Sequence, residues 1–350
     1  MANLSQDTRR PGGVDKTICG GLLEITPAGL FCRAGGFYID PVSRVDRAVI
    51  THGHSDHARP GMSSYLCTSQ SESILRQRLG RDISIQTLDY CQKIKVGDVT
   101  LSMHPSGHIH GAAQIRLELK GCVSVITGDY KRQDDPTADS FELVPCHHLI
   151  SESTFGLPIY RWPEPEKEFQ KIREWWERNA HEGRTSVLFC YSLGKAQRLQ
   201  SALADGPGPV WVHGAIATMN ECVQNNGVSL PAWSKADTEL IRKSGGQGLV
   251  LAPPSTDESA WLKKFGPNSR AMASGWMQVR GRRRHRSLDR GFVVSDHVDW
   301  DGLIRTIHET GCEMVYLTHG YSEAVIRRLG ELGQRARPLD NRDNTDDTGL

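Results

Sequence analysis

The 350-residue sequence predicts an α/β protein with a smaller α/β unit inserted near its middle. Two observations predict this fold. Short β-branched or apolar runs recur along the chain, each bounded by glycine and polar residues, as buried strands are. The part of the chain from 164 to 252 instead alternates amphipathic helical stretches with strands, which favours a separate α/β unit.

Directly after five of the apolar runs come polar residues of types that can bind metal ions or transfer protons. Because they come just past the ends of the expected strands, we expect their side chains to converge along one edge of a sheet. The runs are 48–50 before His52, 123–127 before Asp129, 148–150 before Glu152, 292–294 before His297 and 314–317 before His319.

The middle of the chain begins with an expected helix at 164–183. Phe169, Ile172, Trp175 and Trp176 lie on one face of it, as in an amphipathic helix. Strands are expected at 186–190 and 248–252. We therefore expect an insertion at 165–288, which separates the two segments of the main domain, 1–164 and 289–337. The acidic tail at 338–350 has no apolar periodicity and is expected to be disordered.

Composition limits the class of protein. The net charge of +1 means that a polyanion must be bound by a local patch rather than by the global field. Nine cysteines without a CxxC pair exclude a zinc knuckle and favour reduced thiols in the cytoplasm. A secretory signal is not expected, and no apolar stretch approaches the roughly 20 residues of a membrane span.

The segment THGHSDH at 51–57 is the densest group of metal-ligand residues in the chain. His52 and His54 flank one glycine and can face one metal ion, while Asp56 and His57 can serve a second. His108 and Asp129, each weak evidence alone, complete the set. Histidine and carboxylate ligands without a thiolate suit Zn²⁺ or Mn²⁺. Such a cluster buried without a metal would leave costly unpaired polar groups.

The order of these ligands, preceded by Asp40, resembles the metallo-β-lactamase superfamily. The resemblance implies an αββα sandwich with two divalent metal ions between its sheets. It assigns His52, His54 and His108 to one ion, Asp56 and His57 to the other, and Asp129 to both. Asp40 would orient the histidines from behind. Paired metal ions of this kind activate water at neutral pH for attack on electrophiles such as phosphodiesters.

Three further segments, at 151–156, 295–299 and 318–320, resemble the additional motifs of the β-CASP nucleases. That branch carries an inserted α/β domain between the first and second of these motifs. The resemblance implies that His319 completes the second metal site and that Glu152 pairs with His297. A carboxylate beside a histidine raises its pKa, so the imidazolium persists to protonate a leaving oxygen. The expected catalytic residues are thus Asp56, Asp129, Glu152 and His297.

A narrower resemblance runs from residue 40 to about 320. The segments at 51–61 (THGHSDHARPG), 152–160 (ESTFGLPIY), 191–198 (YSLGKAQR) and 273–284 (ASGWMQVRGRRR) resemble the bacterial DNA-ligase-associated exonuclease family. This implies a DNA exonuclease that acts in repair on single strands or DNA ends, beside an ATP-dependent DNA ligase and a helicase. Resemblance to crosslink-repair nucleases favours cleavage from 5′ to 3′.

A basic stretch just before His297 predicts phosphate contacts close to the metal ions. Its five arginines are Arg280, Arg282, Arg283, Arg284 and Arg286. Lys195, at the expected start of a helix, predicts another phosphate contact. A solvated loop partly paired with Asp289 is the alternative for the arginines. Trp162, Trp261 and Trp276 can stack bases, although core packing is the expected role for most of them.

Three alternatives to a DNA exonuclease stay open. The first is a β-CASP ribonuclease, because the family associates histidine at the position of His319 more with RNA enzymes and valine with DNA enzymes. The second is a small-molecule hydrolase such as a lactamase, which leaves the insertion and the arginines without a role. The third is a non-catalytic scaffold, which tolerates lost ligands, whereas this chain keeps every one.

Overall fold

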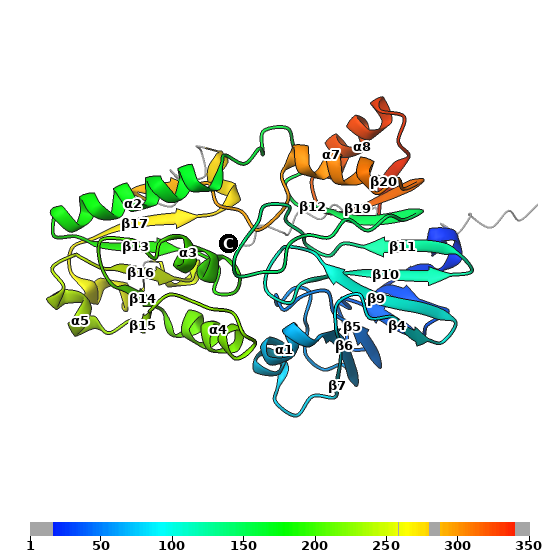
Figure 1. The fold of residues 1–350 in the computed structure, drawn as a ribbon, viewed down its shortest axis with the longest axis horizontal. Coiled ribbons are helices and arrows are strands. Elements are labelled where there is room, and N and C mark those ends of the chain that lie inside the picture. The colour runs from blue at the N-terminus through cyan, green and yellow to red at the C-terminus, as the bar shows by residue number, and fades with distance from the viewer. Residues whose placement is uncertain (1–16, 258, 280–287, 340–350) are drawn as a thin grey trace, which may run out of the picture.

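The computed structural model describes residues 17–257, 259–279 and 288–339, and their strands form three sheets (Figure 1). The first sheet holds, in spatial order, β1 (Thr17–Ile18), β2 (Leu23–Thr26), β3 (Gly29–Cys32), β4 (Phe37–Ile39), β5 (Arg47–Val49), β6 (Ser64–Thr68) and β7 (Ile85–Leu88). The second holds β20 (Ala336–Pro338), β19 (Met314–Gly320), β12 (His148–Ser153), β11 (Cys122–Ile126), β10 (Ala113–Leu119), β9 (Val99–Pro105) and β8 (Ile94–Val96).

These two sheets face each other across an apolar core. β10 alternates in the way a half-buried strand does, with Ile115 and Leu117 fully buried and Arg116 and Glu118 turned outward. The core between the sheets joins residues such as Ile115 and Leu117 to Val49 of the first sheet. The packing is thus that of a sandwich, with one inner face from each sheet.

Helices cover the two outer faces of the sandwich. α1 (Glu72–Leu79) packs on the first sheet through Leu75, while α7 (Trp300–Glu309) and α8 (Ser322–Glu331) pack on the second through residues such as Leu303 and Val325. The layers therefore run helix, sheet, sheet, helix. The predicted αββα fold class is confirmed.

The third sheet lies beside the sandwich and is wholly parallel (Figure 1). Its order is β15 (Ser234–Lys235), β14 (Val210–Val212), β16 (Leu249–Ala252), β13 (Thr185–Phe189), β17 (Asn268–Ala273) and β18 (Arg290–Phe292). Three helices, α2 (Pro165–His181), α3 (Lys195–Ala202) and α4 (Gly214–Asn225), pack on one face, and α5 (Thr238–Lys243) packs on the other. α2 buries the predicted apolar face, which includes Trp175 and Trp176.

The third sheet and the sandwich meet at several places. α1 packs on α4 through a small apolar cluster that contains Ile74 and Val223. β18 extends the third sheet to Phe292, past the expected boundary at 288, and β20 ends at Pro338, where the expected tail begins. We keep the division into 1–164 with 289–337 and 165–288 as a proposal; residues 340–350 lie outside the described part of the chain.

The strand ends place the polar residues as expected. β11, β12 and β19 are parallel neighbours, so their carboxyl ends share one edge of the second sheet, the edge nearer the third sheet. Asp129 follows β11, Glu152 lies in β12 and His319 lies near the end of β19. Within the described ranges no helix is long and apolar enough to cross a membrane. All nine cysteines lie in these ranges and are free thiols.

Candidate active site

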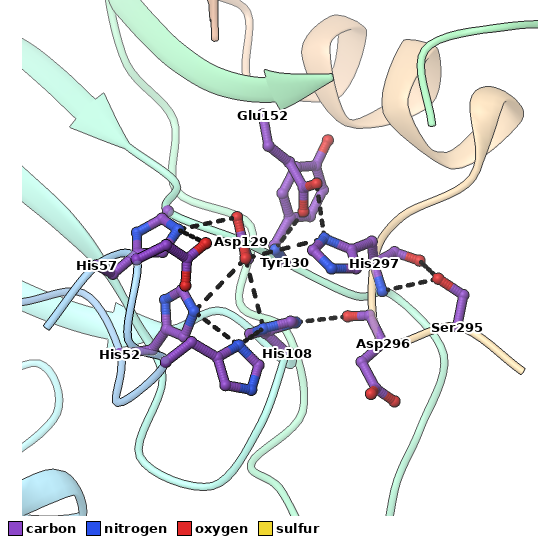
Figure 2. Close-up of polar contacts among 12 residues, drawn as sticks. His52, His57, His108, Asp129, Tyr130, Glu152, Ser295, Asp296 and His297 are labelled. Atoms are coloured by element: carbon purple, nitrogen blue, oxygen red, sulfur yellow. Dashed lines mark hydrogen bonds and ion pairs between the residues drawn. The ribbon is translucent and has the colours of Figure 1, made fainter. Parts of the chain in front are cut away.

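The first candidate metal position joins His52, His54, His108 and Asp129 (Figure 2). His54 Nδ1 lies 3.1 Å from both His52 Nε2 and His108 Nε2. Asp129 Oδ2 lies 3.5 Å from His52 Nε2 and 3.6 Å from His108 Nε2. Zinc bonds of about 2.0–2.1 Å in a tetrahedron place neighbouring ligand atoms about 3.3 Å apart. The donor atoms are therefore already spaced as ligands of one ion.

Backbone carbonyls set the tautomers of two of these histidines. His108 Nδ1 donates to the carbonyl oxygen of Asp296 over 2.7 Å, and His54 Nε2 donates to that of Leu193 over 3.1 Å. A carbonyl oxygen only accepts, so the proton of each neutral ring lies on that nitrogen. The other nitrogen of each ring keeps its lone pair and faces the candidate metal position.

Asp40 and Thr51 orient His52 and the neighbouring His57 through the Nδ1 atoms of their rings. Thr51 donates its hydroxyl proton to Asp40 Oδ2 over 2.5 Å, so its oxygen can accept from His52 Nδ1 at 3.1 Å. His57 Nδ1 donates to the same Asp40 oxygen over 2.8 Å. In both rings Nε2 is the nitrogen that these contacts leave for a metal ion, which in His57 would displace a proton. This is the orienting role expected of Asp40.

Burial keeps the first three histidines uncharged. It lowers the pKa of His54 to about 4 and the pKa values of His52 and His108 well below their usual range. Three buried lone pairs that point at one another would be costly without a cation between them. The residues present therefore fit a divalent ion at this position.

The second candidate position lies on the other side of Asp129. His57 Nε2 lies 3.6 Å from Asp129 Oδ1 and 3.7 Å from Asp56 Oδ2. The His319 ring lies beside the His57 ring, with 5.4 Å between their centroids. The two oxygens of Asp129 thus face different donor sets, as in a carboxylate that bridges two ions. Burial opposes charge on His57, yet Asp129 and Asp40 outweigh it and raise its pKa to about 10.

Backbone strain is concentrated at this position. Asp40 (φ 42°) and His319 (φ 56°) are two of the five non-glycine residues with positive φ in the described chain. Such conformations cost of order 1–3 kcal/mol and persist where the surroundings demand them. Gly128, just before Asp129, also has positive φ, and a Cβ there would lie 2.8 Å from Thr51 Cβ. The turn that carries Asp129 therefore requires glycine.

Buried Glu152 and half-buried His297 form an acid pair beside Asp129 (Figure 2). His297 Nδ1 donates to Glu152 Oε2 over 2.8 Å, and the Tyr130 amide donates to Glu152 Oε1 over 2.7 Å. Burial opposes charge on His297, but the carboxylates of Glu152 and Asp129 outweigh it and raise its pKa to about 9. The imidazolium form therefore persists at neutral pH.

A cavity of about 430 Å³ opens onto both groups. The sandwich contributes His54, Asp56, Asp129 and Arg78 to its lining, and the chain after β12 contributes aromatic and polar side chains such as Phe155, Tyr191 and Trp276. Arg78 and Tyr191 were not expected from the sequence, because neither lies in a ligand motif. The cavity lies where the sandwich and the third sheet meet.

Lys195, the phosphate contact that the sequence suggests, is paired within the protein. Its side chain is 3% exposed and pairs with Asp296, with Nζ 3.1 Å from Oδ2. It borders the cavity as part of a buried ion-pair network, which the sequence does not reveal, rather than as a free cation. The five arginines Arg280, Arg282, Arg283, Arg284 and Arg286 lie outside the described residues. Trp276 is 9% exposed and packs against Phe155, which agrees with core packing.

Comparison with known proteins places the chain. No family model matches it. A probable DNA ligase of Opitutus terrae is 28% identical over 310 residues, which are 88% of this chain and 30% of that protein. Endoribonuclease YSH1 of Eremothecium gossypii is 33% identical over 121 residues, 34% of this chain and 15% of that protein. The Saccharomyces cerevisiae protein of the same name is 31% identical over 121 residues.

These similarities support the resemblance to the DNA-ligase-associated β-CASP nucleases. The matched region spans less than a third of the length of the probable ligase. A protein of unknown function from Enterococcus faecalis has a similar structure, with a TM-score of 0.56 over 78% of this chain and 75% of that one. At 12% identity, that likeness concerns the fold alone.

Removal of one histidine of the first candidate metal position should reduce the metal content of the chain. After zinc loading and desalting, we expect the His108→Ala variant to hold at least one ion fewer than the wild-type chain, because a nitrogen donor is gone. His110→Ala is the matched control, since His110 is buried in the same loop and is not among the converging donors. Metal analysis of the desalted proteins checks this. Equal zinc in His108→Ala and wild type would contradict the assignment.

Proposed function

We propose that the chain is a metal-dependent nuclease that hydrolyses DNA from an end. The observation that carries this proposal is the position of Asp129, whose two carboxylate oxygens face separate donor sets beside a protonated His297. Two bound divalent ions, Zn²⁺ or Mn²⁺, would activate a water and neutralise charge on the scissile phosphate.

The protein's own groups divide the remaining work. His297 binds Glu152 through Nδ1, so its Nε2–H is left to give a proton to the leaving oxygen. Glu152 keeps that imidazole protonated and fixes its orientation. The Asp56 side chain is 53% exposed and borders the cavity, where it can hold the attacking water in reach of the phosphate.

The cavity favours one chain end over a continuous duplex. Pockets of about 300–1,000 Å³ hold ligands of the size of a nucleotide, and this one is about 430 Å³. The Tyr191 ring on its wall is suited to stack on a base. Arg78 borders the same cavity and offers a guanidinium to a phosphate. Lys195 and the arginines at 280–286 are proposed as further phosphate contacts, the lysine through the cavity that it borders.

The proposed setting is DNA repair in the cytoplasm. Similarity to a much longer probable DNA ligase supports action beside an ATP-dependent ligase, and the family resemblance adds a helicase. We propose cleavage from 5′ to 3′, on single strands or DNA ends.

RNA is the second candidate substrate. Two observations favour it: the similarity to endoribonucleases over a third of the chain, and histidine rather than valine at position 319. Both candidates use the same site, so only a direct comparison of substrates separates them.

Loss of the shared carboxylate should abolish cleavage by the full chain. We expect Asp129→Ala to lower the rate by at least about 100-fold, because charge stabilisation at the phosphate is lost. The substrates are DNA and RNA strands of one sequence, labelled separately at each end, with Mn²⁺, Zn²⁺ or Mg²⁺. The proposal expects mononucleotides from the 5′ end of DNA.

The control for this assay is Asp134→Ala, which removes an exposed carboxylate from the same loop. It should cleave at the wild-type rate. Wild-type activity in purified Asp129→Ala would overturn the proposal, and faster cleavage of RNA would select the second candidate.

The pH dependence tests the Glu152–His297 pair. The pKa of His297 is raised to about 9, so the acid form is present below pH 9 and is lost above it. The wild-type rate should therefore fall above about pH 9. Glu152→Gln removes the charge that raises this pKa, so the fall should move to lower pH. Glu309→Gln, an exposed site, is the control. If the alkaline limb does not move, Glu152 does not tune His297.

A further inference from the structure

We propose that Cys91, His104 and Glu142 form an additional zinc site that shares no residue with the candidate active site. Cys91 Sγ lies 3.6 Å from His104 Nδ1 and 3.3 Å from Glu142 Oε2. His104 Nδ1 lies 2.9 Å from Glu142 Oε1. One thiol, one imidazole and one carboxylate thus place ligand atoms within 4.8 Å of one another.

These distances suit zinc. With Zn–S of about 2.3 Å and Zn–N of about 2.0–2.1 Å, tetrahedral geometry separates sulfur from nitrogen by about 3.6 Å, which is the distance observed between Cys91 and His104. The two contacts of Glu142 are hydrogen bonds and have to lengthen by a few tenths of an ångström. The Glu142 side chain is 42% exposed, so it is free to make that small shift.

Backbone contacts hold each of the three residues against β9. Glu142 donates its amide to the Pro105 carbonyl over 3.1 Å, and Gln114 Nε2 donates to the carbonyls of both Pro105 and Glu142. The Cys91 amide donates to the Met103 carbonyl over 2.8 Å. The ligand positions are therefore set by the sheet and do not depend on a bound ion.

Cys91 also adopts a strained conformation. Its φ of 64° makes it one of the five non-glycine residues with positive φ, a group that includes Asp40 and His319 of the active site. Left-handed backbone at a non-glycine residue has a cost and points to a local demand. Here that conformation accompanies a thiol placed within reach of the imidazole and the carboxylate.

The ligand types determine which ion is preferred and how many protons are released when it binds. A thiolate with imidazole and carboxylate suits Zn²⁺, and three protein ligands leave a fourth position for water. On binding, the Cys91 thiol proton leaves to solvent. The His104 proton moves from Nδ1 to Nε2. The new Nε2–H then donates a hydrogen bond to Ser102 Oγ, which lies 3.0 Å away. One proton is released per ion, and two ligand charges neutralise the ion.

The same residues do not form a nucleophilic triad. In a triad the nucleophile and the carboxylate bind opposite nitrogens of the histidine. Here both lie at Nδ1. Partial burial and Glu142 also raise the pKa of the Cys91 thiol, which disfavours the thiolate that a nucleophile needs. A metal ion, which displaces the proton itself, overcomes that preference.

Cobalt binding to the metal-free full chain tests the proposal. Co²⁺ replaces zinc, and a thiolate ligand gives it a charge-transfer band in the near ultraviolet. The candidate active-site donors are all nitrogen and oxygen, so this band reports on thiolate ligation alone. We expect a band equivalent to one thiolate per chain in the wild type and none in Cys91→Ser. The Glu142→Gln variant should require at least roughly tenfold more Co²⁺ than the wild type to reach half of the full band.

Two control variants make the result specific. Cys122→Ser should keep the band, because Cys122, although 3.5 Å from His148 Nδ1, belongs to none of the three-donor groups among the described residues. Asp129→Ala should also keep it, which separates this site from the proposed nuclease centre. Far-ultraviolet circular dichroism checks that each variant is folded. A wild type without the band, or a band that survives Cys91→Ser, would overturn the proposal.

Discussion

The buried carboxylate of Asp129 is the constraint around which the site is built. Its side chain is 7% exposed, and its two oxygens face His52 and His108 on one side and His57 on the other. A buried carboxylate is costly unless cations or hydrogen bonds compensate it. The ends of β5 and β19 supply that compensation together with the loop of His108, so the candidate metal ligands gather where Asp129 is buried.

A second buried carboxylate, Asp296, ties the inserted sheet to the same centre. Lys195 and Arg198 of α3 pair with it over 3.1 Å and 3.6 Å, and Lys131 from the loop after Asp129 approaches to 4.0 Å. The carbonyl of Asp296 also accepts from His108. The third sheet therefore does more than line the cavity. Through Asp296 it helps to orient His108, a candidate metal ligand, and the residue after Asp296 is His297.

Much of this centre could be predicted because its ligands follow strand ends in short motifs. The segment at 51–57, Asp129, the Glu152–His297 pair and the αββα order all required only local patterns and a resemblance. Arg78, Tyr191 and the partners of Asp296 could not be predicted in this way, because their contacts join residues far apart in sequence. Lys195 shows the same limit: its place at a helix start was clear, but its burial against Asp296 depends on tertiary packing. Cys91 gives no local signal either, since its partners lie 13 and 51 residues away.

Anomalous diffraction from crystals of the zinc-loaded full chain tests the role of Asp129 most directly. Apart from the zinc proposed at Cys91, the account predicts two zinc peaks beside Asp129, with Oδ2 near the ion of His52 and His108 and Oδ1 near the ion of His57. Each oxygen should lie about 2.0–2.2 Å from its ion. A single peak beside Asp129, or two peaks there that Asp129 does not join, would contradict it.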